Sequence, residues 1–278
     1  MGHSIEHGSV VVAVDGSGHA DRAVRWAARH ACLERRPLVL VAAAVDALPI
    51  IERAAAAARD VAPQVPVTQL PEHGDPRRIL LDLSDDAGLL VLGSRGRGAI
   101  RSMLLGSVSA AVSAHAACPV VVCRPPGAAD TRQGVLVGAD GTPESRRVVE
   151  FGYRFAALHR LPLSVVHCYW DAVVAVAAYR EARGEPTEVP ALVEERALLA
   201  ESVAGLAEQF PDVAVTLGLR HGLVDEALAP RGEAWDLVVV GRHPMTSLDR
   251  VLSGSIATAV VERSRSTVAI VPEPASLP

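Results

Sequence analysis

The chain has 278 residues, of which 50% are hydrophobic and only 3% aromatic, and this length suggests two domains of ~100–200 residues each. Its formal net charge of −5, with arginines scattered among acidic residues, disfavours a nucleic-acid binder, because phosphate neutralisation needs a concentrated basic surface. All 27 residues of the combined lysine and arginine count are arginine, which excludes every site that needs a lysine ammonium group, such as a P-loop or a Schiff base.

The first half of the chain alternates apolar runs, typical of buried parallel strands, with segments of helical periodicity. The predicted strands are Val10–Val14, Leu38–Val45, Val65–Leu70, Leu89–Leu92 and Val120–Cys123. The predicted helices are Asp21–Arg35, Ile50–Val61, Asp75–Leu83 and Ser107–Ala116. Asp75 and Pro76 suit a helix start, as N-cap and first helical residue.

The second half of the chain repeats the first. An offset of 125 residues aligns Val10–Ser17 with Val135–Thr142, and an offset of 148 residues aligns Gly106-Ser107 with Gly254-Ser255. The difference places an insertion of 23 residues in the second copy, which also has a longer predicted helix at Pro190–Gln209. Several identities in each register indicate a gene duplication.

We therefore expect an α/β fold with two tandem, doubly wound domains, residues 1–125 and 134–278. The alternation of strands and helices favours a Rossmann-like arrangement of five mainly parallel strands in each domain, with right-handed crossovers. In the expected strand order 3-2-1-4-5, the first and fourth strands flank the point where the order reverses. Open α/β sheets bind their ligands at this switch point.

Cysteine spacing and hydropathy predict a cytoplasmic protein. The four cysteines form no Cys-x-x-Cys pair, which favours reduced thiols over a disulfide framework or a zinc site. The first residues lack the apolar core of a signal peptide. The longest weakly polar stretch, Leu38–Ile51, is too short to span a membrane, which needs ~20 apolar residues. We expect neither a membrane partner nor a bound structural metal.

Asp15 ends the first predicted strand and Gly93 ends the fourth, so both are expected at the switch point. Gly96 follows, and Gly106-Ser107 then opens a helix. Glycines allow close backbone approach, and a helix N-terminus offers free N–H groups and about half a positive charge, so together they can hold an anion. Each feature alone is also typical of a plain turn or an N-cap. Their joint placement favours a phosphate ligand.

The spacing Gly93-x-x-Gly96-x9-Gly106-Ser107 matches the glycine signature of ATP-binding universal stress proteins. The opening Val12–Ser17 and the ending Cys118–Val122 also resemble that family. The resemblance covers residues 9–124 and 134–272, so the chain resembles a tandem universal stress protein, whose domains have an adenine-nucleotide α-hydrolase-like fold.

The resemblance implies ATP, with Mg²⁺, as the ligand and assigns no catalytic residue. Asp15 would hold the ribose, and Ala43, near the end of the second strand, would meet adenine through its backbone. Gly93 and Gly96 would line the phosphates. The residues that would grip these phosphates through amides and hydroxyls are Gly106, Ser107, Val108 and Ser109.

The second copy departs from the signature, because Pro244 stands where the second glycine belongs. Proline has no N–H, and loss of one charge-assisted hydrogen bond would weaken phosphate binding by ~1.5–3 kcal/mol. The side-chain charges of Arg242 and His243 are candidates to compensate for the amide donor that Pro244 lacks. A second, weaker site is expected at the residues equivalent to the first site, namely Asp140, Cys168, Gly241, Gly254, Ser255 and Ile256.

The resemblance implies a nucleotide-dependent regulator of the stress response with at most weak ATPase activity. Two alternatives stay open. One is an adenine-nucleotide hydrolase or transferase of the same superfamily, although the Ser-Gly-Gly-x-Asp-Ser loop of ATP pyrophosphatases is absent. The other is a nucleotide-free scaffold. Tandem members commonly pair their halves through the last strands, here Val120–Cys123 and Val268–Val271, and a further homodimer is also conceivable.

Overall fold

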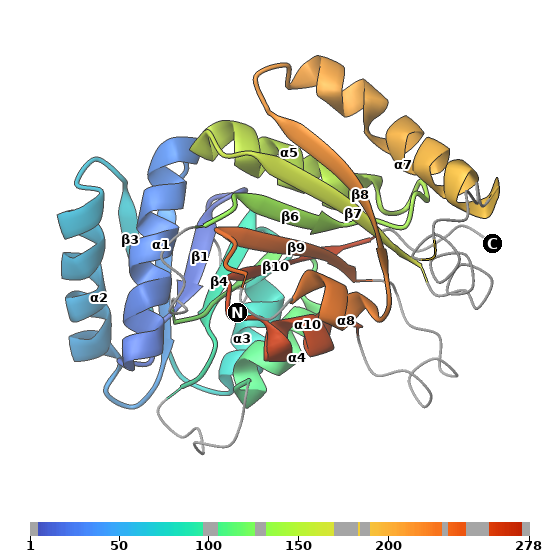
Figure 1. Ribbon diagram of the computed structural model, residues 1–278. Coiled ribbons are helices and arrows are strands. Elements are labelled where there is room, and N and C mark those ends of the chain that lie inside the picture. Colours follow the sequence, from blue (N-terminus) through green and yellow to red (C-terminus); the bar gives the residue numbers. More distant parts are fainter. Residues whose placement is uncertain are drawn as a thin grey trace.

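The computed structural model describes residues 5–96, 105–125, 132–169, 183, 190–229, 233–242 and 256–273. Over these residues the chain forms one ten-stranded sheet with helices on both faces (Figure 1). The strands of the first half are β1 (Val10–Ala13), β2 (Leu38–Ala43), β3 (Val67–Glu72), β4 (Leu89–Gly93) and β5 (Val120–Cys123). Those of the second half are β6 (Val135–Gly138), β7 (Leu163–Tyr169), β8 (Val215–His221), β9 (Leu237–Arg242) and β10 (Val268–Pro272).

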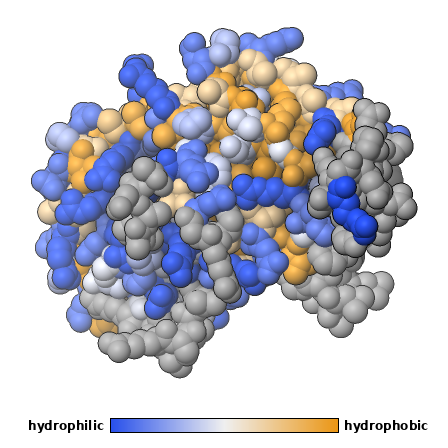
Figure 2. All heavy atoms as spheres, in the orientation of Figure 1, coloured by the Kyte–Doolittle hydropathy of each residue, from blue (hydrophilic) through white to orange (hydrophobic). Residues whose placement is uncertain are grey.

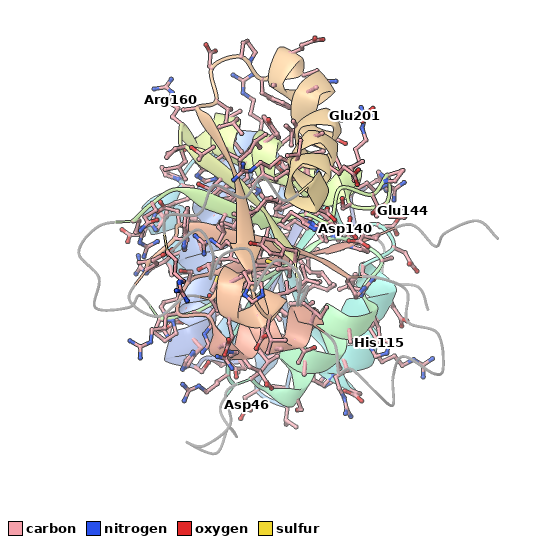
Figure 3. The ribbon with its side chains drawn as sticks, turned by 45° about the vertical axis from the view of Figure 1, so that its right-hand side comes forward. Asp46, His115, Asp140, Glu144, Arg160 and Glu201 are labelled. Carbon is pink, nitrogen blue, oxygen red and sulfur yellow. The ribbon has the colours of Figure 1, made fainter. Side chains whose placement is uncertain are left out.

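The strand order is β3-β2-β1-β4-β5-β10-β9-β6-β7-β8. Each half therefore has the predicted order 3-2-1-4-5, and all its strand pairs are parallel. The halves meet at β5 and β10, which pair antiparallel with Val121 opposite Ala269. Because the strands of the two halves run in opposite directions, their carboxyl ends lie at opposite edges of the sheet. Figure 3 shows this separation, with Asp46 after β2 far from Asp140 after β6.

Helices cover the two faces of the sheet in separate groups (Figure 1). One group is α1 (Gly18–Glu34), α2 (Ala47–Val61), α5 (Arg146–His159) and α7 (Pro190–Gln209). The other is α3 (Pro76–Leu83), α4 (Ser107–His115), α8 (Val224–Leu228) and α10 (Ile256–Arg263). Side chains alternate along each strand, so Val10 and Val12 pack under the first group while Val11 packs under the second. Both layers of the core thus run through both halves.

Predicted boundaries differ from the structure by three residues at the starts of α1 and α2, and by two residues at the end of β2 and at both ends of β3. The helix α1 begins at Gly18, three residues before the expected Asp21, because Ser17 is its N-cap and accepts a hydrogen bond from the Ala20 amide at 3.2 Å. The second helix, α2, begins at Ala47, three residues before Ile50. The expected cap Asp75 is confirmed, since its carboxylate accepts from the Arg77 amide at 3.0 Å.

Aromatic and imidazole rings join the two halves where α1 packs against α5. Trp26, His30, Phe155 and His159 stack, with the Phe155 and His159 ring centroids 3.9 Å apart. The Nδ1 atom of His30 lies 3.1 Å from the Nε2 atom of His159. His30 is only 3% exposed, and burial lowers its pKa to about 3, although Glu34 Oε2 lies 3.7 Å from its other ring nitrogen. A neutral imidazole pair is therefore part of the seam between the halves.

The outer surface differs between the halves. Figure 2 shows hydrophobic surface gathered over β7 and β8, whereas the surface over α1 and α2 is largely hydrophilic. Leu217 of β8 is one of the exposed large hydrophobic side chains, at 39% exposure. Among the helices of the described residues, none combines the length and the apolar character needed to cross a bilayer.

Candidate functional site

A crevice of about 370 Å³ opens at the carboxyl ends of β1 and β4. This is the switch point of the first half, because β1 pairs with β2 on one side and with β4 on the other. The crevice brings together all the site residues predicted for the first half, which are Asp15, Ala43, Gly93, Gly96, Gly106, Ser107, Val108 and Ser109. The residues predicted from the glycine spacing and those predicted from the strand ends therefore line the same crevice.

Asp15 is held in a turn at the end of β1. Its Oδ1 atom accepts a hydrogen bond from the Ser17 amide at 2.9 Å, and the intervening Gly16 has φ +77°, which glycine adopts without strain. The other carboxylate oxygen lies against Gly96, because a Cβ added there would stand 2.7 Å from Oδ2. The structure thus places the carboxylate between the end of β1 and the loop that follows β4.

The helix α4 presents its N-terminus to the crevice. Gly106 is its N-cap, without a side-chain cap, and its carbonyl accepts the first helical bond from the Ala110 amide at 2.9 Å. The amides of Ser107, Val108 and Ser109 precede that bond and have no intrahelical acceptor. Ser107 is exposed and is the first helical residue, so the alternative interpretation of Ser107 as a plain N-cap is wrong. Three backbone donors and the positive end of the helix dipole face the hollow.

Hydrogen bonds fasten α4 to the end of β4. The Ser109 hydroxyl, buried at 6% exposure, donates to the Gly93 carbonyl at 2.7 Å. The Gly106 amide donates to the carbonyl of buried Ser94 at 2.9 Å. The Ser109 hydroxyl therefore donates its proton to the protein backbone, whereas the sequence resemblance implies that it donates to a phosphate. Its backbone amide remains at the helix N-terminus.

Arg95 lines the crevice and was missed as a site residue from the sequence. Its Nε atom is buried and has no hydrogen-bond partner among the residues that the structure describes. Nearby, the His19 Nδ1 atom lies 3.0 Å from the Ser94 hydroxyl. Burial lowers the pKa of His19, and the charges of Arg22 and Arg95 lower it further, so its imidazole is neutral at neutral pH. The sequence did contain a signal for Arg95, because a basic residue stands there between the two signature glycines Gly93 and Gly96.

The other end of the crevice is apolar. Val41 and Ala43 of β2 and Pro76 and Leu80 of α3 form its walls. Small-molecule sites commonly combine such apolar walls with a few polar groups that fix orientation. The hollow therefore has one end suited to a flat apolar ring and another suited to an anion.

The second half repeats only part of this geometry in the described residues. Asp140 Oδ1 accepts from the Thr142 amide at 2.9 Å, as Asp15 does from the Ser17 amide, and also from the Thr142 hydroxyl at 2.7 Å. Cys168 lies in β7, where burial raises the pKa of its thiol to about 11, and Ile256 begins α10 at 51% exposure. The remaining predicted residues His243, Pro244, Gly254 and Ser255 lie outside the described residues.

An acidic side chain occupies the space over Gly241. A Cβ there would overlap the Glu273 carboxylate, whereas over Gly93 the same space holds the His19 backbone, 2.8 Å from an added Cβ. The helix α5 begins at Arg146, three residues later than the equivalent start of α1. The first turn that covers Gly93 is thus missing over Gly241.

Arg242 is directed away from the second half. Its Nη2 atom donates to the Ala116 carbonyl at 2.6 Å and its Nη1 atom to the Ser113 carbonyl at 3.3 Å, both at the end of α4 in the first half. The expectation that Arg242 supplies compensating charge to a second phosphate site is therefore wrong in this structure. The guanidinium satisfies carbonyls that the helix end leaves without donors.

Comparisons with known proteins agree with the fold and the duplication. The profile of the universal stress protein family matches residues 34–124 and 131–272. A universal stress protein of Mycolicibacterium smegmatis is 32% identical over 288 residues, which cover 94% of this chain and 96% of that protein. Universal stress protein Rv2623 of Mycobacterium tuberculosis is 30% identical over 295 residues, with 95% and 96% covered.

Solved structures show the same fold over the whole chain. A functionally unknown protein from Pseudomonas aeruginosa has a TM-score of 0.66 at 16% identity, covering 96% of this chain and 93% of its own. A universal stress protein from Archaeoglobus fulgidus has a TM-score of 0.63 at 17% identity, covering 96% and 99%. With the family profile matched in both halves, the chain belongs to the universal stress protein family, in its tandem-domain form.

Proposed function

We propose that the first half binds ATP in the crevice between β1 and β4, and that the protein acts as a nucleotide-dependent regulator of a stress response. The observation that carries this proposal is the N-terminus of α4, whose first amides face the crevice without a side-chain cap. Such a terminus favours a phosphate group through its N–H donors and its dipole.

The residues that line the crevice support the proposal for each part of the nucleotide. The apolar walls at Val41 and Leu80 suit the adenine ring, and Ala43 at the end of β2 would meet its edge. Asp15 would accept a hydrogen bond from a ribose hydroxyl. Arg95 and the amides of α4 would neutralise phosphates, so no lysine is required. Bound Mg²⁺ would offset further phosphate charge.

We propose a regulatory rather than a catalytic role. Asp15 is the one carboxylate among the described lining residues, and it is hydrogen-bonded to the Ser17 amide and lies against Gly96. A general base must reach the proton of an attacking water molecule, whereas the proposed role of this carboxylate is to accept a hydrogen bond from a ribose hydroxyl. Binding energy would then serve to change self-association or partner choice.

For the second half we propose a weaker site. Pro244 removes one amide donor, and the Glu273 carboxylate over Gly241 adds negative charge near a site for phosphates. Calorimetry with Mg-ATP should therefore resolve one strong component per chain and at most one weak component.

Nucleotide content tests the proposal directly. Purified protein would be denatured and the released small molecules separated by chromatography, and nucleotide-stripped protein would be titrated with Mg-ATP. We expect co-purified adenine nucleotide, or a saturable heat with one strong site. Protein that carries no nucleotide and gives no heat with Mg-ATP would contradict the proposal.

A further inference from the structure

We propose that Arg242, a residue of the second half, is a positioning residue for the nucleotide crevice of the first half. It would act through α4, because the N-terminus of this helix lines the first crevice and its C-terminus contacts Arg242. This inference rests on the proposed function, because it concerns how tightly the first crevice holds phosphates.

The contacts place Arg242 at the far end of the phosphate-binding helix. Arg242 ends β9, next to Gly241, and its guanidinium donates to the carbonyls of Ser113 and Ala116. Ala116 is the C-cap of α4. The last carbonyls of a helix have no intrahelical donors, and a half-buried guanidinium supplies charge-assisted hydrogen bonds to two of them.

The topology explains why this contact crosses between the halves. The antiparallel pairing of β5 with β10 puts the carboxyl ends of the two half-sheets at opposite edges. The helix α4 starts at the first crevice and runs back over nine residues, about 14 Å, toward the edge where β9 ends. Figure 3 labels His115 in the last turn of this helix. One end of α4 therefore lines the first crevice and the other end is held from the second half.

A reciprocal contact strengthens the argument. Arg124 directly follows β5 of the first half, and its guanidinium donates to the carbonyls of Val261 at 2.9 Å and Glu262 at 3.3 Å. Both carbonyls belong to the last turn of α10, the helix equivalent to α4. Each of these two helices is thus anchored at its C-terminus by an arginine from the opposite half.

The expected consequence is specific to the phosphates. Amide donors bind a phosphate only at hydrogen-bond distance, so a small shift of α4 along its axis moves all three N-terminal donors at once. The apolar walls at Val41 and Leu80 belong to β2 and α3 and are not part of α4. Loss of the Arg242 anchor should therefore weaken binding of ATP while leaving binding of adenosine unchanged.

The test compares ATP with adenosine by calorimetry in Arg242→Ala, Arg242→Gln and Arg242→Lys. We expect Arg242→Ala to lower the affinity for ATP by about 2- to 30-fold and to change the affinity for adenosine by less than about 2-fold. Lysine keeps the charge but lacks the planar fork, so Arg242→Lys should recover part of the ATP affinity.

Arg220→Ala is the matched control. Its guanidinium donates to the Ala227 carbonyl near the end of α8, so both partners lie in the second half. This variant removes a comparable arginine-to-carbonyl contact and should change neither ligand's affinity. Circular dichroism would establish folding first, and Arg242→Gln, which keeps the length of the side chain, serves if Arg242→Ala does not fold.

The outcomes separate this inference from the proposed function. A wild-type protein that fails to bind ATP overturns both. If the wild type binds ATP, the inference is overturned when Arg242 variants bind both ligands as the wild type does, or when both affinities fall equally. Hydrogen exchange in the nucleotide-free state adds a second measurement, because the hydrogen-bonded amides of α4, beginning with Ala110, should exchange faster in Arg242→Ala while those of β4 do not change.

Discussion

The carboxylate of Asp15 lies where a side chain on Gly96 would begin, with Oδ2 only 2.7 Å from the position of an added Cβ. Two residues 81 positions apart in the chain thus share one small volume at the mouth of the crevice. The absence of a side chain at Gly96 leaves room for the neighbouring carboxylate.

Gly96→Ala should therefore weaken ATP binding by displacing Asp15. We expect a loss of about 10-fold, the equivalent of one hydrogen bond to a charged group. Because this effect acts through the Asp15 carboxylate, Gly96→Ala should lower the ATP affinity much less when Asp15 is already alanine. Titration calorimetry on the wild type, the two single variants and the double variant measures this coupling. Gly18→Ala is the control, because no atom lies within 4 Å of a Cβ at Gly18. Additive losses would contradict the placement of Asp15.

Gly106→Asp should abolish strong ATP binding without unfolding the protein. A Cβ at Gly106 would stand 3.5 Å from Arg95 Cα, an ordinary contact, so Gly106→Ala should be nearly neutral. A carboxylate there would repel phosphates, and like charges ~4 Å apart cost about 4 kcal/mol at an effective dielectric constant of 20. We expect an affinity loss of about 100-fold or more. Aspartate is a favourable N-cap, so the melting temperature should not fall. Unchanged ATP binding would exclude α4 as the phosphate site.

Arg95→Gln should reduce the affinity for ATP and the salt dependence of binding. Arg95 lines the crevice with a buried Nε atom, and its charge would interact with phosphates rather than with adenosine. Loss of one charge-assisted contact corresponds to a roughly 10-fold weaker affinity. Titrations at low and high salt measure both effects. Arg78→Gln is the control, because that side chain is 85% exposed on α3. Equal losses for ATP and adenosine would place Arg95 outside phosphate recognition.

Acid should destabilise the seam between the halves through His30. Its pKa is lowered to about 3 by burial and by the charges of His159, Arg36 and Arg154. The folded state favours the neutral imidazole. Stability is therefore unaffected by this group above pH 6.5, the pKa of histidine in the unfolded chain, and decreases as the pH falls from 6.5 toward 3. The loss approaches about 1.4 kcal/mol for each pH unit.

Urea unfolding between pH 7 and pH 4 measures this dependence. His30→Phe removes the titrating group but keeps a ring between Trp26 and Phe155, so its stability should fall less steeply with acid. His7→Gln, at a side chain that is 85% exposed, should retain the wild-type slope. A wild-type slope in His30→Phe would show that other groups control acid unfolding.

Local sequence patterns predicted the parts of the fold that depend on local chemistry. The expected doubly wound topology gave the strand order, and the ends of the apolar runs predicted the gathering of Asp15, Gly93 and Gly106 at one crevice. The ATP ligand and the domain boundaries at residues 1–125 and 134–278 stay predictions.

Contacts between distant segments could not be read from the sequence. The direction of Arg242 depends on how β5 and β10 pair, and that pairing brings the end of β9 to the end of α4. The Glu273 carboxylate lies over Gly241, and no spacing in the sequence indicates this contact. The His30–His159 contact likewise requires two helices that pack across the seam.

The antiparallel pairing of β5 with β10 has a consequence for how the sequences of the two halves can diverge. In a dimer of two identical chains, a substitution that alters one crevice alters both at once. Here each half has a permanent partner of different sequence, so the second half can accept Pro244 and Glu273 while its last strand still completes the sheet. One half is then free to specialise as a ligand site and the other as its support.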